Sequence, residues 1–219
     1  MKHPMYEASI RRKARTEEFL SSVGVPLNVN LPRVEDDSEV KLRDALDVER
    51  RSIVLYGISA VGFGAKSERA VSWFKDQALW DSVSPSEKAF LTGESPSQQQ
   101  IVEASWRVES LWTLLWSMGK IESLEFPTTT CDVDRVQDLM PVPDSDCESF
   151  LADSTLRSLP EVLDQLDLIY RIHWAVREAQ LTGQTIPCSI DPSVVYERHY
   201  ALNWLVGCAD QWDDITTDT

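Results

Sequence analysis

Titratable side chains interrupt two of the most apolar segments of the chain, and these residues are the best suited to do chemistry. In the segment 160–181, an apolar stripe at helical spacing continues at its next two turns as His173 and Arg177. The segment 194–206 is apolar or aromatic at most positions, which is typical of a helix buried on all sides. It nevertheless contains four polar residues: Glu197, Arg198, His199 and Asn203. Because a buried charge without a partner is very costly, these side chains must find partners inside the fold.

Partners for these groups are available on two predicted helices. Glu109 lies on an aromatic stripe of the predicted helix 97–118 and requires a cation nearby. Arg171 stands four residues after Asp167, a spacing at which two side chains can pair on one face of a helix. We predict a buried polar cluster whose members are Glu109, Arg171, His173, Arg177, Glu197, Arg198, His199 and Asn203. Six of these residues are expected to form one connected network in or near the core: Glu109, Arg171, His173, Glu197, Arg198 and His199. The alternative is several separate pairs.

We consider three functions for this cluster. In the first, the protein is a non-catalytic interaction or regulatory domain, and the arginine–carboxylate pairs of the cluster only determine how its helices pack. In the second, it lines the cleft of a metal-dependent hydrolase, with His173, Glu197 and His199 as weak candidates for metal ligands. In the third, it contributes an arginine to a small-ligand pocket with aromatic walls. The aromatic candidates are Trp112, Trp174 and Trp204. The chain has no HExxH-like ligand pair and no GxSxG elbow, so we favour the first function and predict no cofactor.

Two further motifs resemble binding sites but lack residues that such sites require. Gly57–Ser67 is rich in glycine like a phosphate loop, but three residues separate Gly62 from Lys66, where a phosphate loop has none. We interpret this segment as a helix end whose glycines permit a turn and close helix packing. The aspartates of residues 132–138 lack the glycine turn and final glutamate of a calcium loop, so we predict that Asp132 caps a short helix.

Composition and charge limit the classes of partner. The 219 residues are 42% hydrophobic and 26% charged, which is typical of a globular chain of one domain. A formal net charge of −15 repels nucleic-acid phosphates and anionic lipids, so the partner we expect is a basic protein. We interpret the basic helix predicted near the N-terminus as a solvated helix; the alternative is that it binds an acidic surface such as the domain's own.

Neither an export signal nor a membrane span is expected. The first twenty residues lack an apolar run. The longest apolar stretch, Ile53–Ala65, is much shorter than the ~20 residues that span a bilayer. We therefore expect a cytoplasmic protein with four reduced cysteines, of which Cys208, on an apolar predicted helix, belongs to the core.

Hydrophobic periodicity predicts an all-α fold, namely a single-domain multi-helix bundle with an extended, proline-containing N-terminal arm. The helices are expected over residues 5–23, 38–62, 67–77, 97–118, 134–139, 160–181 and 192–208, with a further start at Ser84–Glu87, where a capping box is present. The predicted parts are a basic helix (residues 1–24), the extended arm (residues 25–37) and the main helical domain (residues 38–219).

Four strings in the sequence are distinctive: Ser105–Trp112 (SWRVESLW), Asp167–Ala175 (DLIYRIHWA), Val194–Leu205 (VVYERHYALNWL) and the ending Trp212–Thr219 (WDDITTDT). With these strings the chain resembles a bacterial family of uncharacterised domains, one of the numbered families of unknown function. The resemblance covers most of the chain and implies a bacterial, cytoplasmic, largely helical domain. It implies no activity and no active-site residues.

Overall fold

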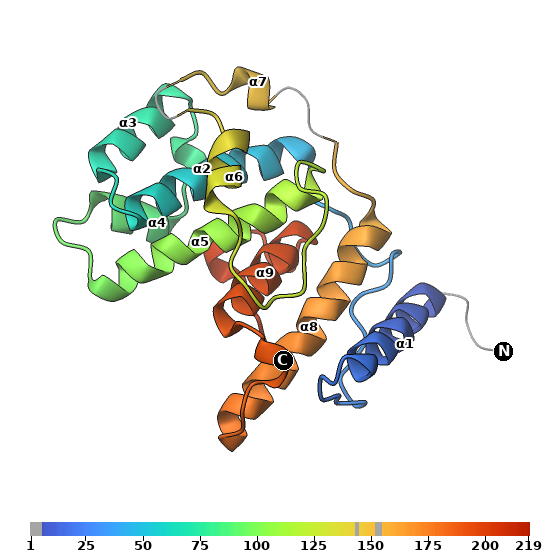
Figure 1. The fold of residues 1–219 in the computed structure, drawn as a ribbon. Helices are drawn as coiled ribbons and strands as arrows, with labels where there is room; N and C mark the ends of the chain where they lie inside the picture. Colours follow the sequence, from blue (N-terminus) through green and yellow to red (C-terminus); the bar gives the residue numbers. More distant parts are fainter. Residues whose placement is uncertain (1–5, 143–144, 152–154) are drawn as a thin grey trace.

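The computed structural model describes residues 6–142, 145–151 and 155–219, and every regular element among them is helical (Figure 1). The α-helices are α1 (Glu7–Ser22), α2 (Ala45–Gly62), α3 (Ser67–Asp76), α4 (Pro85–Thr92), α5 (Gln98–Ser117), α6 (Val133–Leu139), α7 (Glu148–Leu151), α8 (Leu159–Thr182) and α9 (Pro192–Leu205). Short 3₁₀ turns lie at Trp80–Ser82, Pro187–Ser189 and Trp212–Asp214. The prediction of a single all-α domain is confirmed.

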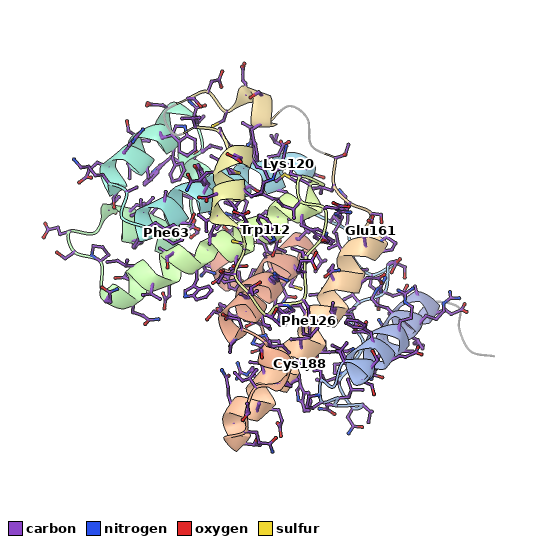
Figure 2. The ribbon with its side chains drawn as sticks, in the orientation of Figure 1. Phe63, Trp112, Lys120, Phe126, Glu161 and Cys188 are labelled. Atoms are coloured by element: carbon purple, nitrogen blue, oxygen red, sulfur yellow. The ribbon has the colours of Figure 1, made fainter. Side chains whose placement is uncertain are left out.

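The helices pack in a continuous series around a shared core. α2 packs against α5, α5 against α9, α9 against α8, and α8 carries α1 on its outer side (Figure 1). α3 and α4 pack against each other and against α2. Side chains fill the spaces between the helices (Figure 2), and Phe126, in the loop after α5, meets Phe19 of α1 edge-on at a ring-centroid distance of 6.3 Å. The series places α9 between α5 and α8.

Two helical glycines let α2 approach its neighbours closely. A Cβ atom at Gly62 would overlap the backbone of Ser105 on α5, and one at Gly57 would overlap the ring of Phe74 on α3. Gly64, with a φ of +102°, makes the turn that follows α2. As predicted, this glycine-rich segment is a closely packed helix end.

Helix starts follow the capping residues expected from the sequence. Ser84 accepts a hydrogen bond from the Glu87 backbone N–H, and the Glu87 carboxylate accepts one from the Ser84 backbone N–H, which completes the capping box of α4. Asp132 accepts a hydrogen bond from the Arg135 backbone N–H and so caps α6. Gly183, with a φ of +67°, ends α8.

Two predicted helix boundaries are wrong, and one contact explains both. α2 begins at Ala45 instead of residue 38, and α9 ends at Leu205 instead of Cys208. Arg43 caps the end of α9, because its backbone N–H donates to the Leu205 carbonyl at 3.0 Å and its Nε–H donates to the Trp204 carbonyl at 2.7 Å. The stretch before α2 is therefore extended, and Cys208 lies on the surface beyond α9 rather than in the core as predicted.

Ion pairs attach α1 to the rest of the domain. Met5, the predicted start of this helix, lies outside the described residues, and α1 begins at Glu7. Arg12, whose side chain is only 3% exposed, contacts Asp164 of α8 at 2.8 Å and Asp37 of the arm at 2.7 Å. The interpretation of the basic helix as solvated is therefore corrected: its buried Arg12 binds the domain's own acidic side chains. No helix in the described part of the chain combines the length and apolarity needed to cross a bilayer.

Candidate functional site

A cavity of about 570 Å³ lies between α5, α8 and α9. Its volume falls within the range of roughly 300–1,000 Å³ that is typical of small-ligand sites. Three of the predicted residues line it: His173 and Arg177 from α8, and Glu197 from α9. The rest of its wall comprises Gln99, Val102, Glu103, Trp106 and Arg107 of α5, Val176 and Gln180 of α8, and Pro192, Ser193 and Tyr196 of α9.

A buried ion pair joins α5 to α9 at this wall. Arg107 Nη1 donates to the two carboxylate oxygens of Glu197 at 3.2 and 3.1 Å, and the Ser110 hydroxyl donates to Glu197 Oε2 at 2.5 Å. Glu197 is only 4% exposed. Burial raises the pKa of Glu197, while the Arg107 guanidinium and the Ser110 hydroxyl act in the opposite direction. Both carboxylate oxygens are therefore committed to the protein.

Two buried histidines contact each other beside this ion pair. The Nδ1 atoms of His173 and His199 lie 2.9 Å apart. Because one Nδ1 must donate and the other accept, two neutral rings in this contact are opposite tautomers. Burial, aided by the charge of Arg177, lowers the pKa of His173 to about 4, and burial next to His173 lowers the pKa of His199 to about 3. Both rings are therefore neutral near pH 7.

The histidine pair stands between two cavities. His173 lines the cavity between α5, α8 and α9, whereas His199 lines a second cavity of about 210 Å³ together with Tyr170 and Asn203. Asn203 donates to the Thr216 carbonyl at 2.7 Å and so holds the C-terminal segment beside this second cavity. One imidazole is thus available to each cavity as a neutral hydrogen-bonding group.

Arg171 belongs to a different group, which fastens α8 to α1 and the arm. It pairs with Asp167 at 2.8 Å, as the four-residue spacing predicts, and both side chains are buried. It also contacts Glu17 of α1 at 3.3 Å and donates to the Pro32 carbonyl at 3.2 Å. This group has a structural role between helices and does not line the cavity between α5, α8 and α9.

Glu109 and Arg198 form a third group, which contacts the loop between α5 and α6. Glu109 Oε1 accepts a hydrogen bond from the Cys131 backbone N–H at 2.5 Å, and Arg198 donates to the Glu125 carbonyl at 2.5 Å. Burial raises the pKa of Glu109, and the Cys131 N–H and the charge of Arg198 oppose the rise. The contacts of the predicted cluster thus divide into separate groups, so the prediction of one connected network is wrong and the alternative of separate pairs describes the structure. The physical reason is that these residues lie on different helix faces, each of which meets a different neighbouring element.

Arg177 differs from the expectation of a buried side chain. It is exposed at the cavity, and no acidic side chain among the described residues pairs with it. Its position near the end of α8 lets the long side chain extend toward water while its stem stays on the helix surface.

Ten of the thirteen residues that line the cavity were not predicted from the sequence, and three of the ten matter most for its chemistry: Trp106, Arg107 and Tyr196. The sequence contained a signal for Arg107. Arg107 and Ser110 are polar residues three apart in an apolar predicted helix, just as His173 and Arg177 are polar residues four apart in the predicted helix 160–181. The tryptophans predicted for a ligand pocket, Trp112, Trp174 and Trp204, are not part of this wall.

The three candidate metal ligands are engaged with other protein groups. His173 and His199 direct their Nδ1 atoms at each other, and Glu197 binds Arg107 and Ser110. Within the part of the chain that the structure describes, no three His, Cys, Asp or Glu side chains converge closely enough to hold a metal ion.

Comparison with known proteins gives one family and no individual relative. The model of a family described as a domain of unknown function, DUF4272, matches residues 12–215. This span contains every residue that lines the cavity between α5, α8 and α9. No curated protein and no solved structure matches the chain. Because the family model covers nearly the whole chain, the protein belongs to the DUF4272 family of domains of unknown function.

Proposed function

We propose that the cavity between α5, α8 and α9 binds a small organic acid. The observation that carries the proposal is the guanidinium of Arg177, which lies at the cavity without an acidic partner in the described residues. Guanidinium groups recognise carboxylates and phosphates through paired, charge-assisted hydrogen bonds. Arg107, by contrast, is committed to Glu197. Arg177 is therefore the cation at this cavity that can receive an anionic ligand.

The other wall groups narrow the chemistry of the ligand. Trp106 and Tyr196 offer aromatic surface, and neutral His173 offers a hydrogen-bonding nitrogen. Glu103 adds a negative charge to the same wall, which disfavours a second anionic group and favours a cationic one. Aromatic monocarboxylic acids and amino acids meet these conditions, with the carboxylate on Arg177.

Ligand-observed NMR with benzoate and phenylalanine tests the proposal, with benzamide as the neutral counterpart of benzoate. We expect the acids to bind saturably and benzamide to bind more weakly. Arg177→Ala should weaken binding of the acids roughly 10- to 100-fold, because a hydrogen bond to a charged group contributes about 1.5–3 kcal/mol. Arg135→Ala, which removes an exposed arginine of α6 outside the cavity wall, is the matched control. Equal binding by Arg177→Ala and wild type would contradict the proposal.

A second proposal, an interaction or regulatory domain that binds a basic protein, is favoured by the distribution of acidic side chains. The net charge is −15, and Asp132, Asp134 and Asp138 are all exposed at α6. Reversing Asp134 and Asp138 to lysine leaves the Asp132 cap of α6 in place and should release a basic partner that wild type captures. Partners that remain bound to this variant would exclude the α6 surface as the contact.

We also propose that the protein works in a bacterial cytoplasm. All four cysteines are free thiols, which suits a reducing compartment: Cys131, Cys147, Cys188 and Cys208. Fusion of the full chain to a fluorescent protein would test the location, and export from the cytoplasm would contradict it.

A further inference from the structure

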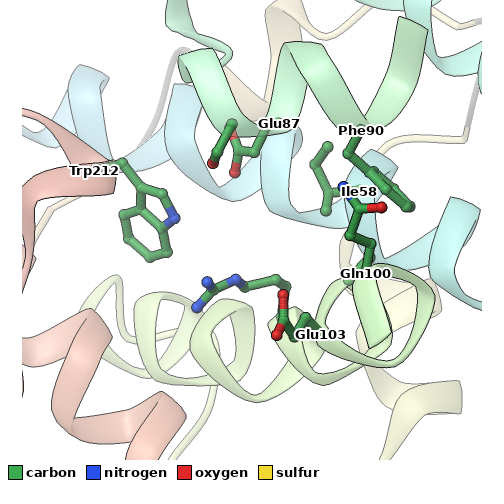
Figure 3. A pocket seen from close by; sticks show the side chains of 9 residues that line it. Ile58, Glu87, Phe90, Gln100, Glu103 and Trp212 are labelled. Carbon is green, nitrogen blue, oxygen red and sulfur yellow. The ribbon is translucent and has the colours of Figure 1, made fainter. Parts of the chain in front are cut away.

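A second, smaller cavity of about 120 Å³ lies between α2, α4, α5 and the 3₁₀ turn that follows α9 (Figure 3). The residues that define its chemistry are Ile58, Glu87, Phe90, Glu103, Arg107 and Trp212. Figure 3 shows the Glu87 carboxylate and the Trp212 indole near one another, with Ile58 and Phe90 across the cavity. Glu103 and Arg107 also line the larger cavity, so the two cavities share a wall.

Two buried polar atoms at this small cavity have no hydrogen-bond partner among the described residues: Glu87 Oε1 and Trp212 Nε1. Glu87 is 6% exposed and Trp212 is 4% exposed. The other carboxylate oxygen, Glu87 Oε2, is already occupied by Arg51 at 2.6 Å and by the Ser84 backbone N–H at 2.9 Å. Folded proteins rarely leave buried polar atoms unpaired, so an open acceptor and an open donor at one cavity require an explanation.

Neighbouring side chains offer no acceptor for the indole N–H, and Arg51 Nε is a further buried donor without a hydrogen-bond partner among the described residues, on the side chain that already donates to Glu87 Oε2. The guanidinium of Arg51 lies 4.8 Å from the centroid of the Trp212 ring, and that of Arg107 lies 5.8 Å from it. Arginine has no acceptor atom, so neither can receive the indole N–H. The carboxylate of Asp213 accepts hydrogen bonds from the Ser86 backbone N–H and hydroxyl at 2.8 and 2.7 Å. The indole N–H therefore has no side-chain acceptor among these neighbours, and Glu87 Oε1 is the unpaired acceptor at the same cavity.

We infer that this cavity binds a neutral group that both donates and accepts a hydrogen bond, namely a primary carboxamide or a hydroxyl. Its N–H or O–H donates to Glu87 Oε1, its oxygen accepts from the Trp212 indole N–H, and its carbon atoms pack on Ile58 and Phe90. A carboxylate lacks the donor and is repelled by Glu87, and an ammonium group lacks the acceptor. The site does not use Arg177, so the inference stands independently of the organic-acid proposal.

Titration of the isotope-labelled full chain with acetamide tests this inference by protein-observed NMR. The Trp212 indole N–H has its own signal, identified by its loss from the spectrum of Trp212→Phe. We expect acetamide to shift this signal saturably, together with the backbone amides of Ser86 and Phe90. N,N-dimethylacetamide accepts a hydrogen bond but cannot donate one, so it should leave these signals in place. The acetamide shifts should persist in Arg177→Ala, which separates this site from the anion site.

Trp212→Phe keeps an aromatic ring but removes the donor, so it should weaken acetamide binding about tenfold, measured at the Ser86 and Phe90 amides. If this variant does not fold, the test is the response of the Ser86 and Phe90 amides of the wild-type chain to acetamide and to N,N-dimethylacetamide. A cavity that holds ordered water only would give no saturable shift with acetamide, and that result would overturn the inference. Equal shifts with acetamide and N,N-dimethylacetamide would overturn it as well.

Discussion

Replacing Glu197 with alanine should destabilise the fold by about 3 kcal/mol, at the low end of the cost of breaking a buried ion pair. Glu197 is 4% exposed, and the substitution removes the acceptors used by Arg107 and Ser110. The side chain of Arg107 is 21% exposed at the cavity wall, so its freed guanidinium regains part of its hydration. Ser110 keeps one acceptor, because its hydroxyl also donates to the Glu197 backbone carbonyl at 3.0 Å.

Urea unfolding at pH 7, followed by tryptophan fluorescence, measures this loss. Glu103→Ala is the matched control, because it removes an exposed carboxylate from the same cavity wall and should change the free energy of unfolding by less than about 0.5 kcal/mol. The double variant Arg107→Met/Glu197→Ala should recover part of the loss, since it removes the unpaired cation. A loss below about 0.5 kcal/mol for Glu197→Ala would refute the reasoning, because the carboxylate would then be hydrated rather than buried.

Three further predictions concern packing, pH and the attachment of α1. Gly62→Ala should lower the free energy of unfolding, measured in urea, by about 1–3 kcal/mol or more. The added Cβ would overlap the backbone of α5, which cannot shift as easily as the end of a side chain. An unchanged unfolding midpoint would contradict the close approach of α2 and α5. Stability should fall by about 2 kcal/mol per histidine from pH 7 to pH 5, because the folded-state pKa values of His173 and His199 lie below the unfolded value of ~6.5 and only the unfolded chain gains protons there. This contribution is present above pH ~6.5 and is lost as the pH falls; His199→Asn should flatten the profile, and an equally steep profile in that variant would contradict the assignment. Asp167→Ala should cost about 3 kcal/mol, because Arg171, 2% exposed, loses its buried partner on α8 and keeps only the partly exposed Glu17 of α1. Because Asp167 holds the Arg171 guanidinium in place against α1, proteolysis of α1 should be faster in this variant; cleavage at the wild-type rate would show that Asp167 does not position Arg171 for that contact.

Local sequence signals predicted most of the fold, and they failed where a distant contact decides the local conformation. Ser84 and Asp132 cap helices as expected because capping depends on residues close in sequence. Val40 and Leu42 fall within the predicted helix 38–62, yet both lie in the extended stretch before α2 and pack against the core from there. That stretch is held by Arg43 at the end of α9, more than 150 residues away along the chain. Periodicity cannot reveal such a contact, because it reports only which residues are apolar.

The candidate site was predictable in its members but not in their pairing. Glu197, His173 and His199 interrupt apolar helix faces, and this pattern indicated correctly that they are buried. The partner of Glu197 is Arg107, which was not among the arginines considered, because the choice depends on α5 packing against α9. Arg177 lies on the predicted stripe but reaches solvent, since a long side chain near a helix end can extend past the core.

Native mass spectrometry of the gently purified full chain tests the central claim, that the cavity between α5, α8 and α9 holds a small ligand through Arg177. We predict a discrete excess mass on the wild-type chain, in the range of a small organic acid, that is retained by Arg135→Ala and lost in Arg177→Ala. An excess mass retained equally by Arg177→Ala would place the ligand elsewhere. Only the bare mass of the chain, or multiples of it, from every preparation would contradict the ligand-binding account and favour the interaction domain.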